Sequence, residues 1–137
     1  MIIADTSAIL TLLDQSARHH VALRRAFETN HGDWVLPWAI LPELDYMVAA
    51  RLGDAVAEAL RTDLAEGGFT IEWGRPADLK RAVELNRTFS ALRLGLVDGV
   101  VMAVAERLAA RAIATLDLRD FGSVSLHGQP ELWPRDL

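Results

Sequence analysis

The sequence predicts an α/β fold in which a parallel sheet of four to five strands is covered by helices on both faces, a three-layer α/β/α arrangement. Two observations predict it. Short apolar segments, typical of buried strands, alternate with longer segments whose apolar residues recur at helical spacing. No linker, internal repeat or low-complexity tract divides the 137 residues, so we expect a single domain over residues 1–137.

The first strand and the first two helices lie in the N-terminal quarter of the chain. Ile2-Ile3-Ala4 is a short apolar run that Asp5 ends, as expected of a buried strand. Helices are predicted over residues 7–14 and 18–30. Residues 34–37 then form the second strand.

The middle of the chain supplies two helices and the third strand. Pro42 suits the first turn of a helix, which ends or bends at Gly53. Asp54 is the expected N-cap of the next helix, which runs to Gly67. The segment 69–73 is the third strand.

The C-terminal part contains two more helices and the fourth strand. One helix covers about residues 77–89, and a second, strongly apolar helix carries Asp98 in its first turn. Residues 112–115 form the fourth strand, and residues 123–126 are expected to form a fifth, short edge strand. The last ten residues carry no clear signal.

Composition excludes several classes of protein. The chain has no cysteine, which rules out disulfides and thiolate metal sites. Its N-terminus does not resemble a signal peptide and no segment is long and apolar enough to span a membrane, so a cytoplasmic location without membrane contact is expected. The net charge of -5 argues against binding nucleic acid through bulk positive charge alone.

Four carboxylates are predicted to meet at one edge of the sheet. Asp5 follows the first strand and Asp117 follows the fourth. Glu43 and Asp98 lie in the first turns of helices that begin at the same edge. Ligands of parallel α/β sheets bind at this carboxyl edge.

Glu43 and Asp98 are also expected to point inward, because each shares a helix face with apolar residues. Converging carboxylates must either hold protons or bind a cation. Mg²⁺ prefers such oxygen ligands, and a pair of ions can act on a phosphodiester. Each acid alone also has an ordinary explanation, as a helix cap or a turn residue. The shared edge is what favours a site.

The chain resembles the PIN-domain ribonucleases, and specifically the VapC-type toxins of toxin–antitoxin pairs. The segments that carry the resemblance are MIIADTSAILTLL at the N-terminus, LPEL with Glu43, LGLVDGVVMAVAERL with Asp98, and IATLDLRDF with Asp117. They occur in the right order and spacing over nearly the whole chain.

The resemblance implies an endoribonuclease that depends on Mg²⁺ or Mn²⁺, with one or two ions bound. It implies Asp5, Glu43, Asp98 and Asp117 as the catalytic metal site. Thr6, Thr115 and Asp120 match accessory positions beside such a site. Expected partners are the RNA substrate, a cognate antitoxin protein and a second copy of the chain in a homodimer.

Other functions fit less well. A haloacid-dehalogenase-type phosphatase needs an acid at the position of Ser7, and a receiver domain needs a late lysine, whereas the only lysine is Lys80. A PIN-fold module that binds an antitoxin or RNA without cleaving it stays open as the alternative. A weaker expectation is an RNA-backbone patch in the segment 75–93, which is otherwise an ion-paired surface.

Most of the tryptophans and histidines have structural explanations. Trp34, Trp38 and Trp73 are expected in the core. Trp133 in the tail is a candidate anchor for a partner, and the pair His19-His20 is expected on the surface.

Overall fold

The computed structural model describes residues 1–137 and contains one five-stranded sheet in which every strand pair is parallel. The strand order is β3-β2-β1-β4-β5, so the first strand lies at the centre. The strands are β1 (Ile2–Ala4), β2 (Trp34–Pro37), β3 (Thr70–Glu72), β4 (Ala112–Ala114) and β5 (Glu131–Trp133). The predicted parallel sheet is confirmed, with five strands.

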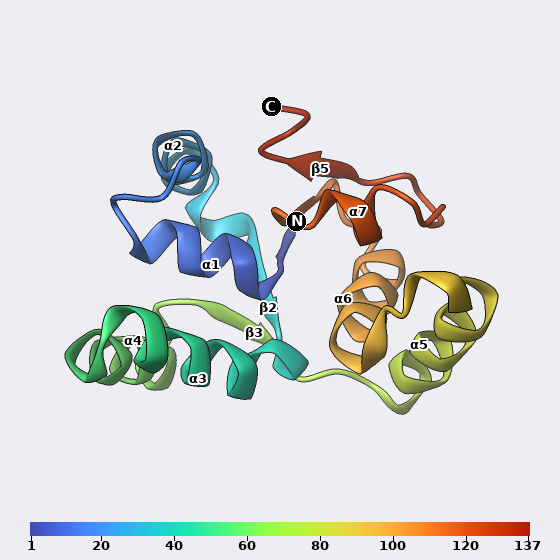
Figure 1. Ribbon diagram of the computed structural model, residues 1–137, viewed down its shortest axis with the longest axis horizontal. Helices are drawn as coiled ribbons and strands as arrows, with labels where there is room; N and C mark the ends of the chain where they lie inside the picture. Colours follow the sequence, from blue (N-terminus) through green and yellow to red (C-terminus); the bar gives the residue numbers. More distant parts are fainter.

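Seven α-helices connect and cover the strands. They are α1 (Thr6–Leu13), α2 (His20–Thr29), α3 (Leu41–Leu52), α4 (Asp54–Ala65), α5 (Pro76–Thr88), α6 (Gly95–Arg107) and α7 (Leu118–Phe121). In Figure 1, α1 to α4 lie in the left half and α5 to α7 in the right half, with β1 and β2 between them. This is the three-layer arrangement that the sequence predicts. None of these helices has the length and apolar character needed to cross a bilayer.

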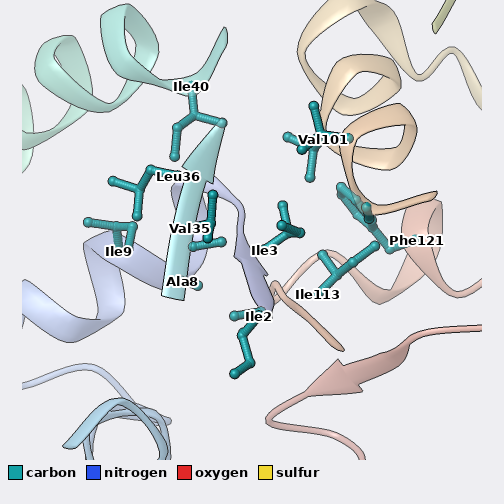
Figure 2. Packing of buried hydrophobic residues seen from close by; sticks show 14 of the residues in the cluster. Ile2, Ile3, Ala8, Ile9, Val35, Leu36, Ile40, Val101, Ile113 and Phe121 are labelled. Carbon is teal, nitrogen blue, oxygen red and sulfur yellow. The ribbon is translucent and has the colours of Figure 1, made fainter. Parts of the chain in front are cut away.

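The core lies between the sheet and both helical layers. Figure 2 shows Ile3 of β1 between Ile9 of α1 on one side and Val101 of α6 on the other, with Ile113 of β4 beside Ile3. Ile3, Ile9, Val101 and Ile113 are fully buried. Burial of β1 on both faces explains why its three residues are all apolar. Because the packed strand β1 ends at Ala4, Asp5 lies at the carboxyl edge of the sheet.

The predicted fifth strand at residues 123–126 is wrong. That segment is irregular and connects α7 to the true edge strand, β5, which pairs with β4 through Ile113 and Leu132. Val124 and Leu126 are buried there, so their alternation reflects packing rather than strand pairing. Pro130 and Pro134 bracket the three-residue β5, and proline weakens a strand signal in a sequence.

Three aromatic or histidine predictions also need correction. Trp133 is 1% exposed, and its Nε1 donates to Glu131 Oε2 at 2.7 Å, so it belongs to the fold and is not a free anchor. Trp73 is 72% exposed instead of lying in the core. His20 is buried, with Nδ1 2.8 Å from the carbonyl oxygen of Thr11.

The boundaries of α1 to α6 agree with the predictions to within two residues, with one difference in capping, whereas the four-residue helix α7 is not predicted. The N-cap of α4 is Gly53 with φ 95°, and Asp54 is the first residue of the helix. A positive φ at the junction of two helices favours glycine, because a side chain would be strained there. Gly53 therefore ends α3, as predicted, and also starts α4.

Candidate active site

The four predicted acids line one cleft of about 440 Å³ at the carboxyl edge of the sheet. Asp5 follows β1, Asp117 lies three residues after β4, and Glu43 and Asp98 lie in the first turns of α3 and α6. Parallel strands all end at the same edge, and each following helix begins there. The topology therefore brings together residues that are far apart in the sequence.

Asp5 is the N-cap of α1 and is almost fully buried. Its Oδ1 accepts a hydrogen bond from the backbone N–H of Thr6 at 2.8 Å. Its Oδ2 accepts from the hydroxyls of Thr115, at 2.9 Å, and Ser7, at 3.2 Å. These donors hold the carboxylate in one orientation at the cleft wall.

Ser7 and Thr115 also hold the loop that carries Asp117. Ser7 Oγ accepts from the N–H of Leu116 at 2.9 Å, and Thr115 Oγ1 accepts from the N–H of Asp117 at 3.1 Å. Each hydroxyl thus bridges Asp5 to the β4–α7 loop. Sequence reasoning assigned an accessory role to Thr115 but none to Ser7, although Ser7 is only two residues from Asp5.

Thr6, the other predicted accessory hydroxyl, does not join this network. Its side chain is buried, and its Oγ1 has no hydrogen-bond partner. The backbone N–H of Thr6, rather than its hydroxyl, contacts Asp5.

Asp98, Asp117 and Asp120 form the tightest group of acids, with one carboxylate oxygen of each lying within 4.8 Å of the others. Asp117 caps α7 by accepting from the N–H of Asp120 at 3.0 Å. Asp120 Oδ1 is buried and has no hydrogen-bond partner. The acid expected to be accessory is therefore a full member of the cluster.

Glu43 occupies the opposite wall of the cleft, on α3, and is exposed. Glu43 was expected to point inward beside Met47. Both residues line the cleft, but Glu43 is exposed and not buried. It is not part of the tight group formed by Asp98, Asp117 and Asp120. The exposed Glu43 side chain is therefore less constrained than that of Asp5, which three hydrogen bonds hold in place.

Electrostatic repulsion within the cleft is visible in the pKa values. Burial, and after it the charges of Asp5, Asp117, Asp120 and Glu43, together raise the pKa of Asp98 to about 7. Burial also raises the pKa of Asp5, although its hydrogen bonds act against this rise. The pKa of Asp120 is raised by burial and by Asp117.

Buried acids elsewhere in the fold have arginine partners. Asp78 lies 2.8 Å from Arg107, and that contact lowers the pKa of Asp78 against the effect of burial. Glu106 lies 2.7 Å from Arg81 and its pKa is likewise lowered. Asp5 and Asp98 have no such partner. The cleft is the place where buried negative charge is left uncompensated by the protein.

A close contact between α5 and α6 fixes the position of Asp98. A Cβ at Gly99 would lie 2.9 Å from the Cβ of Ala82 and 2.9 Å from Asn86 Nδ2. Asn86 also exchanges two hydrogen bonds of 2.9 Å with the backbone of Gly95, the first residue of α6. These contacts hold the first turn of α6 against α5, and they therefore also hold Asp98, which lies in that turn.

The donor set fits a hard divalent cation. It consists of carboxylate oxygens, the ligands that Mg²⁺ and Mn²⁺ prefer. Asp120 Oδ1 accepts no hydrogen bond and Asp98 has no basic partner, so a bound cation would satisfy both. The arrangement can therefore hold divalent metal and place it against an anionic substrate.

A parallel α/β/α fold with an acidic cluster at the carboxyl edge of its sheet is compatible with a metal-dependent nuclease. The PIN domain family model matches residues 2–125, and the chain belongs to the PIN domain family. Ribonuclease VapC26 of Mycobacterium tuberculosis is 30% identical over 122 residues, which are 89% of this chain and 90% of that protein. The chain is an endoribonuclease similar to the VapC proteins, a family that in general depends on divalent metal.

Solved structures show the same fold at lower sequence identity. VapC20 of M. tuberculosis, described as a toxin that cleaves the sarcin–ricin loop, has a TM-score of 0.80 at 17% identity, covering 93% of this chain and 98% of its own. DNA-bound VapBC from Salmonella typhimurium has a TM-score of 0.71 at 15% identity, covering 96% and 95%. FitAcB from Neisseria gonorrhoeae has a TM-score of 0.65 at 19% identity, covering 96% of each chain.

Proposed function

We propose that this endoribonuclease binds Mg²⁺ or Mn²⁺ through Asp5, Glu43, Asp98 and Asp117, with Asp120 as a further ligand, and hydrolyses RNA phosphodiester bonds there. The observation that carries the proposal is the group formed by Asp98, Asp117 and Asp120, whose oxygens lie within 4.8 Å of one another in the cleft of Asp5. The only basic side chain that contacts this group is the exposed Arg119, whose Nε lies 3.8 Å from Asp120 Oδ1. Asp98 and Asp117 have no basic partner, and converging carboxylates of this kind favour a bound cation.

Each acid has its own part in the proposed reaction. Hydrogen bonds from Thr6, Ser7 and Thr115 fix the orientation of the Asp5 carboxylate, so it would be a ligand of constant position. Glu43 is exposed and lines the cleft from α3, so it would be an available further ligand for the ion. Asp98 would hold a cation in its deprotonated form, so its raised pKa of about 7 would make metal binding favour higher pH.

A bound divalent ion supplies a Lewis acid for the phosphodiester and makes water a stronger nucleophile at neutral pH. The protein supplies the orientation. Ser7 is the only serine that lines the cleft, no histidine lines it, and the Ser7 hydroxyl is held in place by donating to Asp5 and accepting from the N–H of Leu116. A protein nucleophile is therefore not part of the proposal.

We further propose that the enzyme is the toxin of a toxin–antitoxin pair, inhibited by a small antitoxin protein, and that it forms a homodimer. Similarity to Ribonuclease VapC26 along 89% of the chain supports the toxin assignment. The fold shared with the DNA-bound VapBC from S. typhimurium is consistent with an antitoxin partner. Copurification with the product of a neighbouring short reading frame, and light scattering of the free protein, measure these two points.

The test of activity is cleavage of total cellular RNA by the purified protein, free of antitoxin, with Mg²⁺, with Mn²⁺ and with a chelator. Discrete fragments that require metal support the proposal and identify the RNA that is cut. Folded, metal-loaded protein that binds RNA and leaves every class of RNA intact would support the binding-module alternative instead.

A further inference from the structure

The active-site cleft extends well beyond the acids. From Asp5 and Asp98 it runs lengthwise between α1 and α3, which pack against each other. The α1 wall presents Leu10, Thr11 and Asp14, and the α3 wall presents Met47, Arg51 and Leu52. The part beyond the acids is apolar in its middle and polar at its far end.

Arg51 lies at that far end. Glu43, Met47 and Arg51 are four residues apart along α3 and share one face of the helix. Eight residues separate Arg51 from Glu43, which corresponds to about 12 Å along the helix axis. Arg51 is therefore too far along the cleft to act on the phosphate that meets the acids.

Arg51 is the only basic residue that lines the cleft. It is exposed and makes no ion pair, whereas Arg24, Arg61, Arg81 and Arg107 all contact carboxylates. The nearest acid along the α1 wall, Asp14, accepts hydrogen bonds from the backbone and hydroxyl of Ser16 at 3.0 and 2.6 Å. The guanidinium is thus free to bind an anion from outside the protein.

Arg51 lies in the last turn of α3, where the helix dipole stabilises a positive charge, and this alone could explain an arginine at that position. Arg87 has this position in α5, is also exposed and also lacks an ion pair, but it does not line the cleft. The helix dipole accounts equally for both residues. It does not account for an unpaired arginine in a cleft whose other charged residues are all acidic.

We propose that Arg51 binds a backbone phosphate of the RNA substrate other than the one at the cleaved bond, and that the strand runs along the cleft between α1 and α3. This inference rests on the proposed ribonuclease function of the same cleft. A substrate cut at the acids must continue on both sides of the cut, and the cleft provides one continuous path. Leu10, Met47 and Leu52 offer apolar contacts to riboses and bases between the two polar ends.

The test measures binding of a short fluorescein-labelled single-stranded RNA of mixed sequence to the full chain, in a background carrying Asp98→Asn to prevent cleavage. Arg51→Ala is expected to weaken binding roughly tenfold at low salt, and Arg51→Lys to restore most of it. The slope of log K against log salt should fall by about 0.7, the contribution of one single-strand phosphate.

Arg87→Ala is the matched control, since it removes an exposed, unpaired arginine from the last turn of another helix. It should leave both affinity and slope unchanged, and thermal unfolding should confirm that both variants are folded. Equal effects of the two substitutions, or no effect of Arg51→Ala, would overturn the inference. Competition as effective by polyglutamate as by polyuridylate would also overturn it, because the site would then bind any acidic chain.

Cleavage by the wild-type protein, measured in parallel, separates this inference from the proposed function. Metal-dependent cleavage with unchanged RNA binding by Arg51→Ala means that the function stands and the assigned strand path is wrong. Absence of cleavage with weakened binding by Arg51→Ala means that the cleft binds RNA but the proposed function fails.

Discussion

Thr115 donates a hydrogen bond of 2.9 Å to Asp5 across 110 residues of sequence. The bond follows from the sheet, because β1 and β4 are neighbours in register, with Ala4 opposite Ala114, and Asp5 and Thr115 come next on each strand. Thr115 Oγ1 also accepts from the N–H of Asp117 at 3.1 Å. One hydroxyl thus fixes two of the proposed metal ligands, Asp5 and Asp117, relative to each other.

Thr115→Val is expected to weaken metal binding about 10- to 100-fold, the usual effect of losing a group that orients a metal ligand. The substitution keeps the side-chain shape but removes the donor to Asp5 and the acceptor of Asp117. Isothermal titration with Mn²⁺ measures the change. Thr115→Ser, which keeps the hydroxyl, should restore most of the affinity, and equal affinity of the valine variant and the wild type would contradict this role.

Gly99→Ala is expected to destabilise the fold by about 1–3 kcal/mol, the usual cost of overpacking. The new methyl would lie 2.9 Å from Ala82 Cβ and 3.1 Å from its Cα, so α6 must move away from α5. Since Asp98 precedes Gly99, metal affinity should fall as well. Chemical denaturation and Mn²⁺ titration measure the two effects. Gly32→Ala, with open space around its Cβ position, is the control and should change neither.

The metal-free protein should lose stability from Asp98 as the pH rises. Below about pH 4 this carboxyl is protonated whether the chain is folded or unfolded, so it carries no penalty. Between its ordinary pKa of 3.8 and its pKa of about 7 in the fold, only the unfolded chain releases the proton, and the free energy of unfolding falls.

Asp98→Asn removes this penalty. In chelator at pH 8 the variant should be more stable than the wild type by on the order of 2 kcal/mol, and the difference should disappear near pH 4. Denaturation curves at several pH values measure it. A variant that is less stable than the wild type at pH 8 without metal would show that Asp98 stabilises the fold by itself.

Asp120→Asn tests the member of the cluster that was expected to be only accessory. Its carboxylate lies within 4.8 Å of Asp98 and Asp117 and is 13% exposed, so its loss should reduce Mn²⁺ affinity about tenfold or more. Asp136→Asn is not a suitable control, because Asp136 accepts from the N–H of Leu132 in the edge strand. Asp63→Asn, on the exposed face of α4, is suitable and should bind Mn²⁺ normally.

Much of the fold follows from patterns within short segments. The strands Ile2–Ala4 and Trp34–Pro37 are apolar runs bounded by polar or turn residues, and both were predicted with their observed limits. The rule that parallel strands end at one edge then predicts the shared cleft of Asp5, Glu43, Asp98 and Asp117. Strand β5 was missed because its pairing with β4, and not its composition, makes its three residues a strand.

The parts of the site that sequence reasoning missed depend on contacts between distant segments. Ser7 links Asp5 to the β4–α7 loop because its hydroxyl accepts from the N–H of Leu116 at 2.9 Å, and nothing in the local sequence of either residue indicates that contact. The contribution of Asp120 likewise depends on where the short helix α7 packs beside α6. Such distances require the register of the strands and the packing of the helices, which a single sequence does not specify.

The most direct test of the account is the rate of RNA cleavage as a function of Mg²⁺ concentration for the wild type, Asp98→Asn and Asp63→Asn. We expect the wild type and Asp63→Asn to cleave at equal, Mg²⁺-dependent rates and to stop in chelator. We expect Asp98→Asn to be slower by at least about a hundredfold at any Mg²⁺ concentration, while remaining folded. Cleavage by Asp98→Asn at the wild-type rate, or cleavage by the wild type in chelator, would contradict the assignment of these carboxylates as the catalytic metal site.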